Sequence, residues 1–293
     1  MAHKAGFVNI VGNPNVGKST LMNALVGEKI SIITSKSQTT RHRILGIVNG
    51  EDFQIVYSDT PGVIKPNYHL QKHMLSFSRS ALVDADVLLY VTDVVEQIDK
   101  NMDFLDRVRK TEIPIFVIIN KIDLSNQEKV EGLISRWKTM LPKAEIFPAS
   151  ARHNFNMDHI LSRIQELLPE SPPYFDKDQL TDKSERFFVT EIIREKILMN
   201  YQQEVPYAVE PEVEEFERSE NIIRIKTVIH VERDSQKGII IGKGGSALKK
   251  TGTDARKELE AFFGIKIHLE IFVKVSKNWR DKPGLLRSFG YNQ

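Results

Sequence analysis

The octapeptide "GNPNVGKS", residues 12–19, decides how the first half of this chain is expected to fold. It fits the pattern G-x-x-x-x-G-K-[ST] and lies between the apolar run "GFVNIV" and a stretch with helical spacing, which is the context that the pattern requires. Its glycines allow backbone N–H groups to wrap a phosphate, and the N-terminus of the following helix adds a favourable dipole. The octapeptide therefore predicts a phosphate-binding loop between a strand and a helix.

The sequence on either side of this loop predicts an α/β domain. Apolar runs rich in Val and Ile alternate with stretches of helical period through residue 168, and the main runs are "GFVNIV", "FQIVYS", "DVLLYVT" and "IPIFVII". This alternation is typical of a largely parallel sheet covered by helices on both faces. The stretch "RILGIVNGEDFQIVYS" predicts two strands around a tight turn, so we expect one antiparallel pair in a mixed, mostly parallel sheet.

Composition and charge limit the class of protein and its partners. The 293 residues include no cysteine, which excludes disulfides, thiolate metal sites and cysteine nucleophiles. No signal-peptide pattern and no apolar run of the length that spans a membrane is present, so we expect a cytoplasmic protein. The charge balance is zero over residues 1–180, −6 over 204–220 and +8 over 221–293. The basic C-terminal quarter favours a polyanionic partner, with an unevenly charged but merely solvated surface as the alternative.

Two short motifs downstream of the phosphate loop indicate which nucleotide it holds. They are "DTPG" at 59–62 and "NKID" at 120–123, and each follows a strand-like run. Asp59 would hold Mg²⁺ through water, and the Gly62 N–H would meet the γ-phosphate. The Asp123 carboxylate can accept hydrogen bonds from guanine N1–H and the 2-amino group, whereas adenine offers neither donor. Asp123 therefore predicts selection of guanine.

Two more motifs complete the order that a GTPase requires. "SA", Ser150 and Ala151, follows the last strand-like run, and its backbone would contact guanine O6. "SQTTRHR", residues 37–43, supplies a switch threonine for Mg²⁺ and the γ-phosphate. We favour Thr40 for this role, and Thr39 remains the alternative. Each motif is weak alone, but together and in this order they predict a P-loop GTPase domain.

These motifs define the expected nucleotide site. Lys18 would bridge the β- and γ-phosphate oxygens, while Ser19, Thr40 and Asp59 would ligate Mg²⁺. The residues expected to act in catalysis are Lys18, Thr40 and Gly62. The full set expected to bind GTP is Gly12, Asn13, Pro14, Asn15, Val16, Gly17, Lys18, Ser19, Thr20, Asp59, Thr60, Pro61, Gly62, Val63, Asn120, Lys121, Ile122, Asp123, Ser150 and Ala151.

Val63 departs from the pattern of Ras-like enzymes. In those enzymes a glutamine that orients the attacking water follows the glycine of the second motif, and here that position is valine. Valine can neither accept a proton nor orient water. We therefore expect slow intrinsic GTP hydrolysis that depends on positioning and on charge neutralisation by Lys18 and Mg²⁺.

The chain changes character after residue 168. Three prolines among polar residues in "LPESPPYFDKDQLTDKS", residues 168–184, mark the best domain boundary. We expect a GTPase domain at 1–168, a linker at 169–184 and a second domain at 185–293. The patterns of the second domain predict the order helix–strand–strand–helix–helix–strand.

The second domain has a glycine-rich stretch of its own, "IGKGG" at 241–245, which lacks the spacing of a nucleotide loop. It matches the I-G-x-x-G core of a KH domain, in which a loop without side chains lets a sugar–phosphate backbone approach a helix N-terminus. The order of elements matches the type II KH topology, an α+β fold. The alternative is a glycine turn between packed helices with solvated lysines. The residues expected to bind RNA are Ile241, Gly242, Lys243, Gly244, Gly245, Lys249 and Lys250.

The combination of "GNPNVGKS", "QTTRHR", "DTPG", "NKID", "SA" and "IGKGG" resembles the Era family of bacterial GTPases, and the resemblance covers essentially the whole chain. The double-GTPase family Der fits less well because the chain contains a single "GKS" and a single "NKID". Val63 fits the pattern of the Era family, in which a hydrophobic residue replaces the glutamine.

The resemblance implies partners and cofactors that the residues alone do not show. It implies binding of the 3′ end of 16S ribosomal RNA, a role in assembly and maturation of the 30S subunit, and stronger RNA binding with GTP than with GDP. It also implies peripheral contact with the inner membrane, and we expect a monomer. Asn15 matches a phosphate-loop asparagine that coordinates K⁺ in related potassium-activated GTPases, which makes K⁺ a hypothesis beside Mg²⁺.

Two alternatives stay open at this point. The second domain could bind a protein or membrane partner instead of RNA, with a vestigial glycine loop. The aromatic and basic stretch "NWRDKPGLLRSFGY", residues 278–291, suits stacking on bases and equally suits a tail packed on the second domain.

Overall fold

The computed structural model describes residues 2–96 and 101–291. The chain divides into two compact units, one of residues 1–66 and 74–182 and the other of residues 67–73 and 183–293. Each unit has a sheet and a hydrophobic core of its own. They are described separately below.

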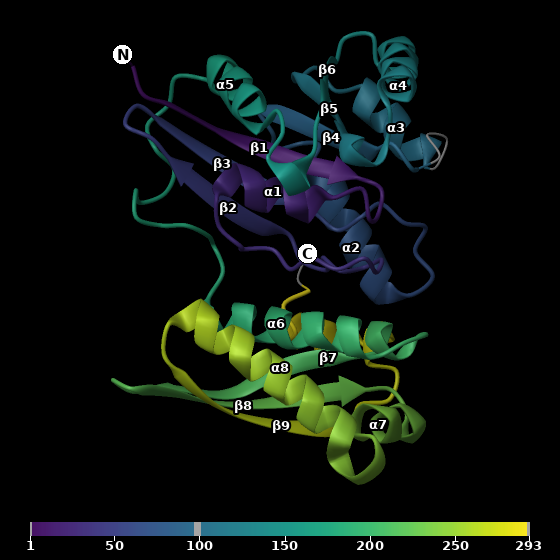
Figure 1. Ribbon diagram of the computed structural model, residues 1–293, viewed down its shortest axis with the longest axis vertical. Helices are drawn as coiled ribbons and strands as arrows, with labels where there is room; N and C mark the ends of the chain where they lie inside the picture. Colours follow the sequence, from purple (N-terminus) through teal and green to yellow (C-terminus); the bar gives the residue numbers. More distant parts are fainter. Residues whose placement is uncertain (1, 97–100, 292–293) are drawn as a thin grey trace. The chain divides into compact units, whose positions relative to one another are not determined.

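The sheet of the first unit has six strands in the order β2-β3-β1-β4-β5-β6 (Figure 1). Its strands are β1 (Lys4–Gly12), β2 (Ile44–Asn49), β3 (Phe53–Asp59), β4 (Val87–Asp93), β5 (Ile115–Asn120) and β6 (Glu145–Pro148). The β2–β3 pair is antiparallel and all other pairs are parallel. The predicted mixed, mostly parallel sheet is therefore confirmed, including its single antiparallel hairpin.

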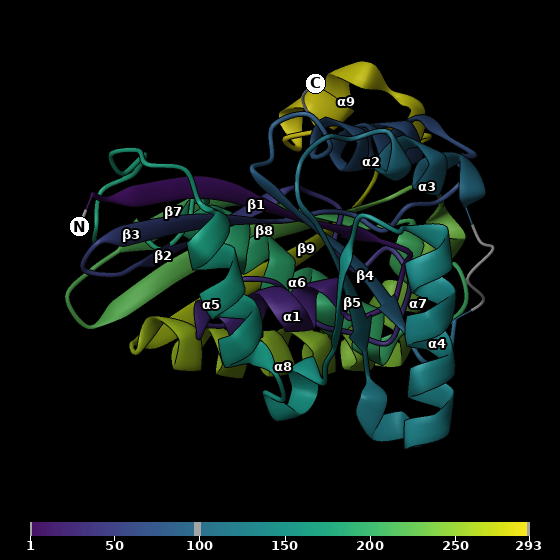
Figure 2. The same cartoon turned by 90° about the horizontal axis from the view of Figure 1, so that it is seen from above.

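Helices cover both faces of this sheet, which explains why its strands are apolar along their whole length. The helices are α1 (Lys18–Val26), α2 (His69–Ser80), α3 (Met102–Arg109), α4 (Gln127–Met140) and α5 (Met157–Leu167). Val11, Tyr90 and Val117 belong to a core cluster with side chains of α3 and α4. On the other face the rings of Phe116 and Phe147 stack and lead to α5, and Figure 2 shows α1 and α5 on this side.

The segment expected to be a linker lies against the first unit. The Gln54 side chain on β3 accepts a hydrogen bond from the Tyr174 N–H at 2.7 Å. The Thr181 hydroxyl donates to the Leu45 carbonyl on β2 at 2.6 Å. Most of residues 169–182 is therefore bound to the edge of the first sheet by hydrogen bonds.

The second unit has the predicted order of elements, α6 (Glu185–Asn200), β7 (Glu210–Arg218), β8 (Ile222–Val231), α7 (Asp234–Ile241), α8 (Ser246–Phe263) and β9 (Lys266–Val275). The sheet order is β7-β8-β9, with β7 antiparallel and β9 parallel to β8. Figure 1 shows α6 and α8 side by side on one face of this sheet. Their apolar side chains form one core with the inward residues of the strands.

The C-terminal stretch of aromatic and basic residues is packed on the second unit. Trp279 and Tyr291 are fully buried. The Trp279 indole N–H donates to the Ala208 carbonyl at 3.0 Å, and the Tyr291 hydroxyl donates to the Glu210 carboxylate at 3.0 Å. Phe289 packs edge-on against Trp279. Of the two readings left open by the sequence, the structure supports the packed tail for these aromatic residues.

Charged residues interrupt the long helices of the second unit. The helix α8 has 18 residues and reads "SALKKTGTDARKELEAFF". Across residues 2–96 and 101–291, no helix combines the length and the apolar character needed to cross a membrane.

Candidate nucleotide and nucleic-acid sites

The phosphate loop turns from β1 into α1, and its surroundings require glycine at two positions. Gly12 and Gly17 have φ angles of +150° and +96°. A Cβ at Gly12 would lie 2.2 Å from the carbonyl oxygen of Val91 on β4, and one at Gly17 would lie 2.3 Å from the side-chain nitrogen of Asn120. Both contacts are closer than real Cβ atoms approach, so the neighbouring strands leave no room for a larger residue.

Lys18 begins α1 and is buried beneath the loop. Its Nζ donates to the Asn13 carbonyl at 2.8 Å. Burial lowers the pKa of Lys18 to about 8, while the negative charges of Asp59 and Glu96 act in the opposite direction. A phosphate group beside Nζ would favour the charged form of Lys18 and would raise its pKa.

Ser19, Thr40 and Asp59 meet at one point, although they come from three separate segments. The Ser19 hydroxyl donates to Asp59 Oδ2 at 2.6 Å and lies 2.9 Å from Thr40 Oγ1. Thr40 Oγ1 also donates to Asp59 Oδ2 at 3.3 Å. The second carboxylate oxygen, Asp59 Oδ1, is buried and has no hydrogen-bond partner among the described residues. Burial raises the pKa of Asp59, while the hydrogen bond from Ser19 and the positive charge of Lys18 act in the opposite direction.

Thr39 lies on a different side of the same loop. Its hydroxyl donates to the Lys36 carbonyl and lies beside the Thr34 hydroxyl, both at 2.6 Å. Thr39 thus stabilises the fold of its own loop. Only Thr40 of the two threonines lies with Ser19 and Asp59.

The residues expected to contact guanine follow the ends of β5 and β6. Asn120 donates to the Val16 carbonyl at 2.9 Å and accepts from the Ala151 N–H at 3.0 Å, so it links the phosphate loop to the last motif. Asp123 accepts a hydrogen bond from the Ser150 hydroxyl at 2.6 Å. This bond lowers the pKa of Asp123. The carboxylate therefore stays ionised and can accept hydrogen bonds from a base.

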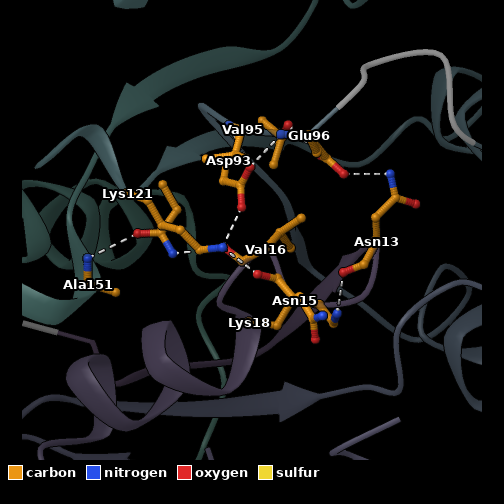
Figure 3. A network of polar contacts seen from close by, with 11 residues as sticks. Asn13, Asn15, Val16, Lys18, Asp93, Val95, Glu96, Lys121 and Ala151 are labelled. Atoms are coloured by element: carbon orange, nitrogen blue, oxygen red, sulfur yellow. Dashed lines mark hydrogen bonds and ion pairs between the residues drawn. The ribbon is translucent and has the colours of Figure 1, made fainter. Parts of the chain in front are cut away.

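Lys121 connects the two ends of the site. Its Nζ donates to the Asn15 carbonyl in the phosphate loop and to the Asp93 carboxylate at the end of β4 (Figure 3). Asn15 itself has a φ of +67°, a backbone conformation in which asparagine is over-represented.

A cavity of about 620 Å³ lies between these groups. The predicted residues that line it are Pro14, Asn15, Gly17, Lys18, Ser19, Thr20, Thr40, Gly62, Asn120, Lys121 and Asp123. The other predicted residues do not line the cavity, namely Gly12, Asn13, Val16, Asp59, Thr60, Pro61, Val63, Ile122, Ser150 and Ala151. Such a volume is in the usual range for a site that encloses a small molecule.

The cavity wall also contains residues that the motifs did not reveal. They are Ile32, Ile33, Thr34, Ser35, Leu124 and Arg152, whereas Gln38 and Thr39, which also line the cavity, belong to the motif at 37–43. Leu124 and Arg152 directly follow "NKID" and "SA", so adjacency to a motif could have identified them. Residues 32–35 belong to a segment without a motif, and no sequence signal marked them.

Val63 faces away from this cavity. Its side chain is 4% exposed and lies in the core cluster of the first unit with Val11 and Leu105. The valine side chain therefore packs the domain interior instead of reaching the site of the phosphates.

The glycine loop of the second unit joins α7 to α8. Gly242, Gly244 and Gly245 have φ angles of +72°, +58° and +79°, which side chains disfavour. A Cβ at Gly242 would lie 2.6 Å from the Ala247 Cβ, whereas Cβ atoms at Gly244 and Gly245 would meet nothing within 4 Å. The first glycine packs against α8, and the other two leave an open surface at the start of that helix.

A groove of about 370 Å³ continues from this loop along α8. Its walls are formed by Gly245 before α8 and by residues of α8 and β9, namely Leu248, Lys249, Gly252, Thr253, Arg256, Leu269 and Ile271. Lys249 thus lies in the groove. Lys250 instead donates to Asp254 at 2.8 Å and to the Asn200 side chain at the end of α6, so its predicted role in RNA binding is the weaker of the two.

Comparison with known proteins assigns both units to one family. Residues 7–121 match the family model described as a 50S ribosome-binding GTPase, and residues 204–280 match the model of the KH domain. The chain is 40% identical over 291 residues to the GTPase Era of Staphylococcus epidermidis, which covers 99% of this chain and 97% of that protein. This chain belongs to the Era GTPases.

Other relatives agree along the full length. The GTPase Era of Staphylococcus haemolyticus is also 40% identical over 291 residues, again covering 99% and 97% of the two chains. An Aquifex aeolicus Era bound to GDP·AlF₄⁻ superposes with a TM-score of 0.94 at 39% identity, covering 99% of this chain and 100% of the other. An Era crystallised with MgGDPNP and nucleotides 1506–1542 of 16S ribosomal RNA gives a TM-score of 0.95 at 39% identity, with the same coverage.

Proposed function

We propose that this Era protein is a GTP-hydrolysing switch that binds the 3′ end of 16S ribosomal RNA and acts in assembly and maturation of the 30S subunit in the cytoplasm. One observation supports this most strongly. A complete guanine-nucleotide cavity and an open glycine loop with a groove occur in one chain, and an Era relative was crystallised with both kinds of ligand.

The nucleotide would bind with Mg²⁺. Ser19, Thr40 and Asp59 supply oxygen atoms of the kind that Mg²⁺ prefers, and the unpartnered buried Oδ1 of Asp59 fits a cation or its water shell. Bound Mg²⁺ would neutralise charge on the β- and γ-phosphates. The crystallised relative contains MgGDPNP, which supports the same assignment.

Hydrolysis would depend on the backbone and on Lys18. The Lys18 ammonium would stabilise negative charge on the transferred phosphoryl group, and Gly62, which lines the cavity, would direct its N–H to the γ-phosphate. Val63 offers no polar atom there from its side chain. We therefore propose that intrinsic GTP hydrolysis is slow. GTPases that supply further groups to the transition state have rates that are higher by orders of magnitude.

Two further cofactor and partner assignments belong to this proposal. Asn15 lines the cavity and would be the K⁺ ligand. The loop from Ile241 to Gly245, together with Lys243 and Lys249, would bind the sugar–phosphate backbone of single-stranded RNA while bases enter the groove along α8.

The direct test measures steady-state GTP hydrolysis with and without a single-stranded RNA that spans the 3′ end of 16S ribosomal RNA. Each assay is run in KCl and in NaCl at equal ionic strength, with a scrambled RNA of the same length as control. The proposal predicts faster hydrolysis with the matched RNA than with the scrambled one, and a higher rate in KCl. Equal rates in the two salts would remove the K⁺ assignment. No RNA effect together with no RNA binding would favour a protein or membrane partner for the second unit.

A further inference from the structure

A polar network holds the phosphate loop through residues that do not line the cavity. The Asn13 side chain donates through Nδ2 to Glu96 Oε2 at 2.8 Å (Figure 3). The Thr92 hydroxyl donates to Glu96 Oε1 at 2.6 Å. The amide of Asn101, at the start of α3, donates to Asn13 Oδ1 at 2.8 Å. Glu96 and Asn101 are not part of any nucleotide motif, yet both hold the same loop residue.

The network also reaches the residue that follows the "DTPG" motif. The Asn101 Nδ2 donates to the Val63 carbonyl at 2.9 Å. The Val63 N–H donates to the Gly12 carbonyl at 3.1 Å, and its side chain is buried in the core. Val63 is therefore held by its amide, its carbonyl and its side chain.

Holding Val63 also determines where Gly62 lies. A Cβ at Gly62 would be 2.7 Å from the Pro14 Cα, so the two loops are in close backbone contact. The Gly62 peptide is thus packed between Pro14 and the fixed Val63. A donor that must meet developing charge is most effective when it is already in place, because no reorganisation is then required during the reaction.

We propose that Glu96 and Asn101 are positioning residues for GTP hydrolysis, which act through Asn13 and Val63 to hold the phosphate loop and Gly62 in register. In an enzyme without a glutamine at position 63, this backbone register replaces part of what a polar side chain would contribute. The inference rests on the proposed GTP hydrolysis at the same site.

The charge of Glu96 is a separate effect that the test must distinguish. Asp59 and Glu96 both favour the protonated form of Lys18, and Lys121 opposes it. A variant at Glu96 that removes the charge but keeps the hydrogen-bonding shape separates positioning from electrostatics. Glu96→Gln is such a variant, since its carbonyl oxygen can accept from Asn13 while its amide donates to the Thr92 hydroxyl.

The first experiment compares Asn101→Gly with Asn156→Gly. Each asparagine directly precedes a helix and has a positive φ, 57° for Asn101 and 68° for Asn156. Asn101 Nδ2 donates to the Val63 carbonyl and Asn156 Nδ2 donates to the Pro148 carbonyl, both at 2.9 Å. Glycine adopts this backbone conformation without strain, so each substitution removes the side-chain amide, and the added backbone freedom is common to both variants. Single-turnover hydrolysis at saturating GTP and the affinity for GDP are measured for both.

The proposal predicts that Asn101→Gly lowers the single-turnover rate about tenfold and leaves GDP affinity within about twofold of the wild type. Asn156→Gly should leave both unchanged. Glu96→Ala should also lower the rate about tenfold, and Glu96→Gln should recover most of it. If Glu96 and Asn101 only stabilised the fold, their substitution would lower thermal stability but would not lower the hydrolysis rate while GDP affinity stays unchanged.

Two results would overturn the inference. One is a wild-type rate in both Asn101→Gly and Glu96→Ala, and the other is a parallel loss of rate and GDP affinity. A wild-type protein that itself hydrolyses no GTP would instead contradict the proposed function, so the two failures are distinguishable.

Discussion

Two glycine-rich loops, Gly12–Ser19 and Ile241–Gly245, each lead into a helix N-terminus, but they use glycine for different reasons. In the first loop, glycine is required by the protein around it, because Cβ atoms at Gly12 and Gly17 would collide with Val91 and Asn120. In the second loop, Gly244 and Gly245 have open space around the Cβ position. There glycine is required by the positive φ angles and leaves the surface free for a partner.

The difference explains how each loop treats its ligand. The first borders an enclosed cavity of about 620 Å³, whose wall also contains Asn120 at the end of β5 and the segment around Thr40, and a cavity of this kind suits a small molecule. The second lies at the end of an open groove of about 370 Å³ and suits a long polymer that is bound along one side. Variants in the two loops should therefore affect different ligands.

Asp123→Asn should have the largest effect, and it should be confined to the nucleotide. An amide would present a donor toward guanine N1–H and the 2-amino group, so we expect GTP affinity to fall about 1,000-fold. Xanthine nucleotides, which have a carbonyl at C2, should bind the variant better than GTP does. Nucleotide affinities measured for both bases check this, with Asp158→Asn, an exposed residue of α5, as the control. Unchanged GTP affinity would contradict the assignment of Asp123.

Gly245→Asp should have a smaller effect, and it should be confined to the RNA. The new carboxylate lies at a positive φ and faces the proposed RNA backbone, so RNA affinity should fall about 100-fold at fixed salt. Hydrolysis without RNA should stay at the wild-type rate. The control is Gly264→Asp at the opposite end of α8, where φ is +65° and the surroundings are equally open. Equal RNA affinity for Gly245→Asp and Gly264→Asp would show that the second loop is not the RNA site.

Thr40→Ala and Thr39→Ala separate the two candidate switch threonines. Thr40 lies with Ser19 and Asp59, so its loss should lower hydrolysis about 30-fold and weaken the dependence on Mg²⁺. Thr39 bonds within its own loop, and its loss should change the rate less than about threefold. Hydrolysis rates over a Mg²⁺ titration measure both. The reverse ranking would assign the metal to Thr39.

The pH dependence of nucleotide binding should show the smallest effect. Burial lowers the Lys18 pKa to about 8 in the free protein, and bound phosphates favour the charged form. Nucleotide binding near pH 8 should therefore take up about half a proton, and GDP affinity should fall as the pH rises from 7 to 9. Calorimetry in two buffers with different ionisation enthalpies measures this uptake. Its absence at pH 8 would mean that Lys18 is already fully charged before the nucleotide binds.

The sequence predicted the helices, strands and motifs correctly where a local hydrophobic or glycine pattern determines them. The alternating apolar runs predicted the sheet and its antiparallel hairpin, and the glycine pattern with the order of helices and strands predicted the second unit. Lys250 was predicted less well, because its side chain forms an ion pair with Asp254, one helical turn further along α8. That spacing was visible in the sequence, but only the position of α6 places Asn200 beside it.

The network of Glu96 and Asn101 could not be predicted. These residues lie 83 and 88 positions from Asn13, and no motif includes them. Their contacts depend on the parallel order of β1 and β4, which brings the segments after these strands to the same edge of the sheet. Val63 shows the same limit, because the sequence shows which residue replaces glutamine but not that its side chain packs in the core.

The most direct test of coupling between the two units measures the affinity of one single-stranded RNA from the 3′ end of 16S ribosomal RNA at one fixed salt concentration, first with a non-hydrolysable GTP analogue and then with GDP. A coupled switch predicts tighter RNA binding with the GTP analogue, and by linkage the RNA must raise the affinity for that analogue relative to GDP by the same factor. RNA affinity that is equal in the two nucleotide states would contradict it, because the two glycine loops would then act independently.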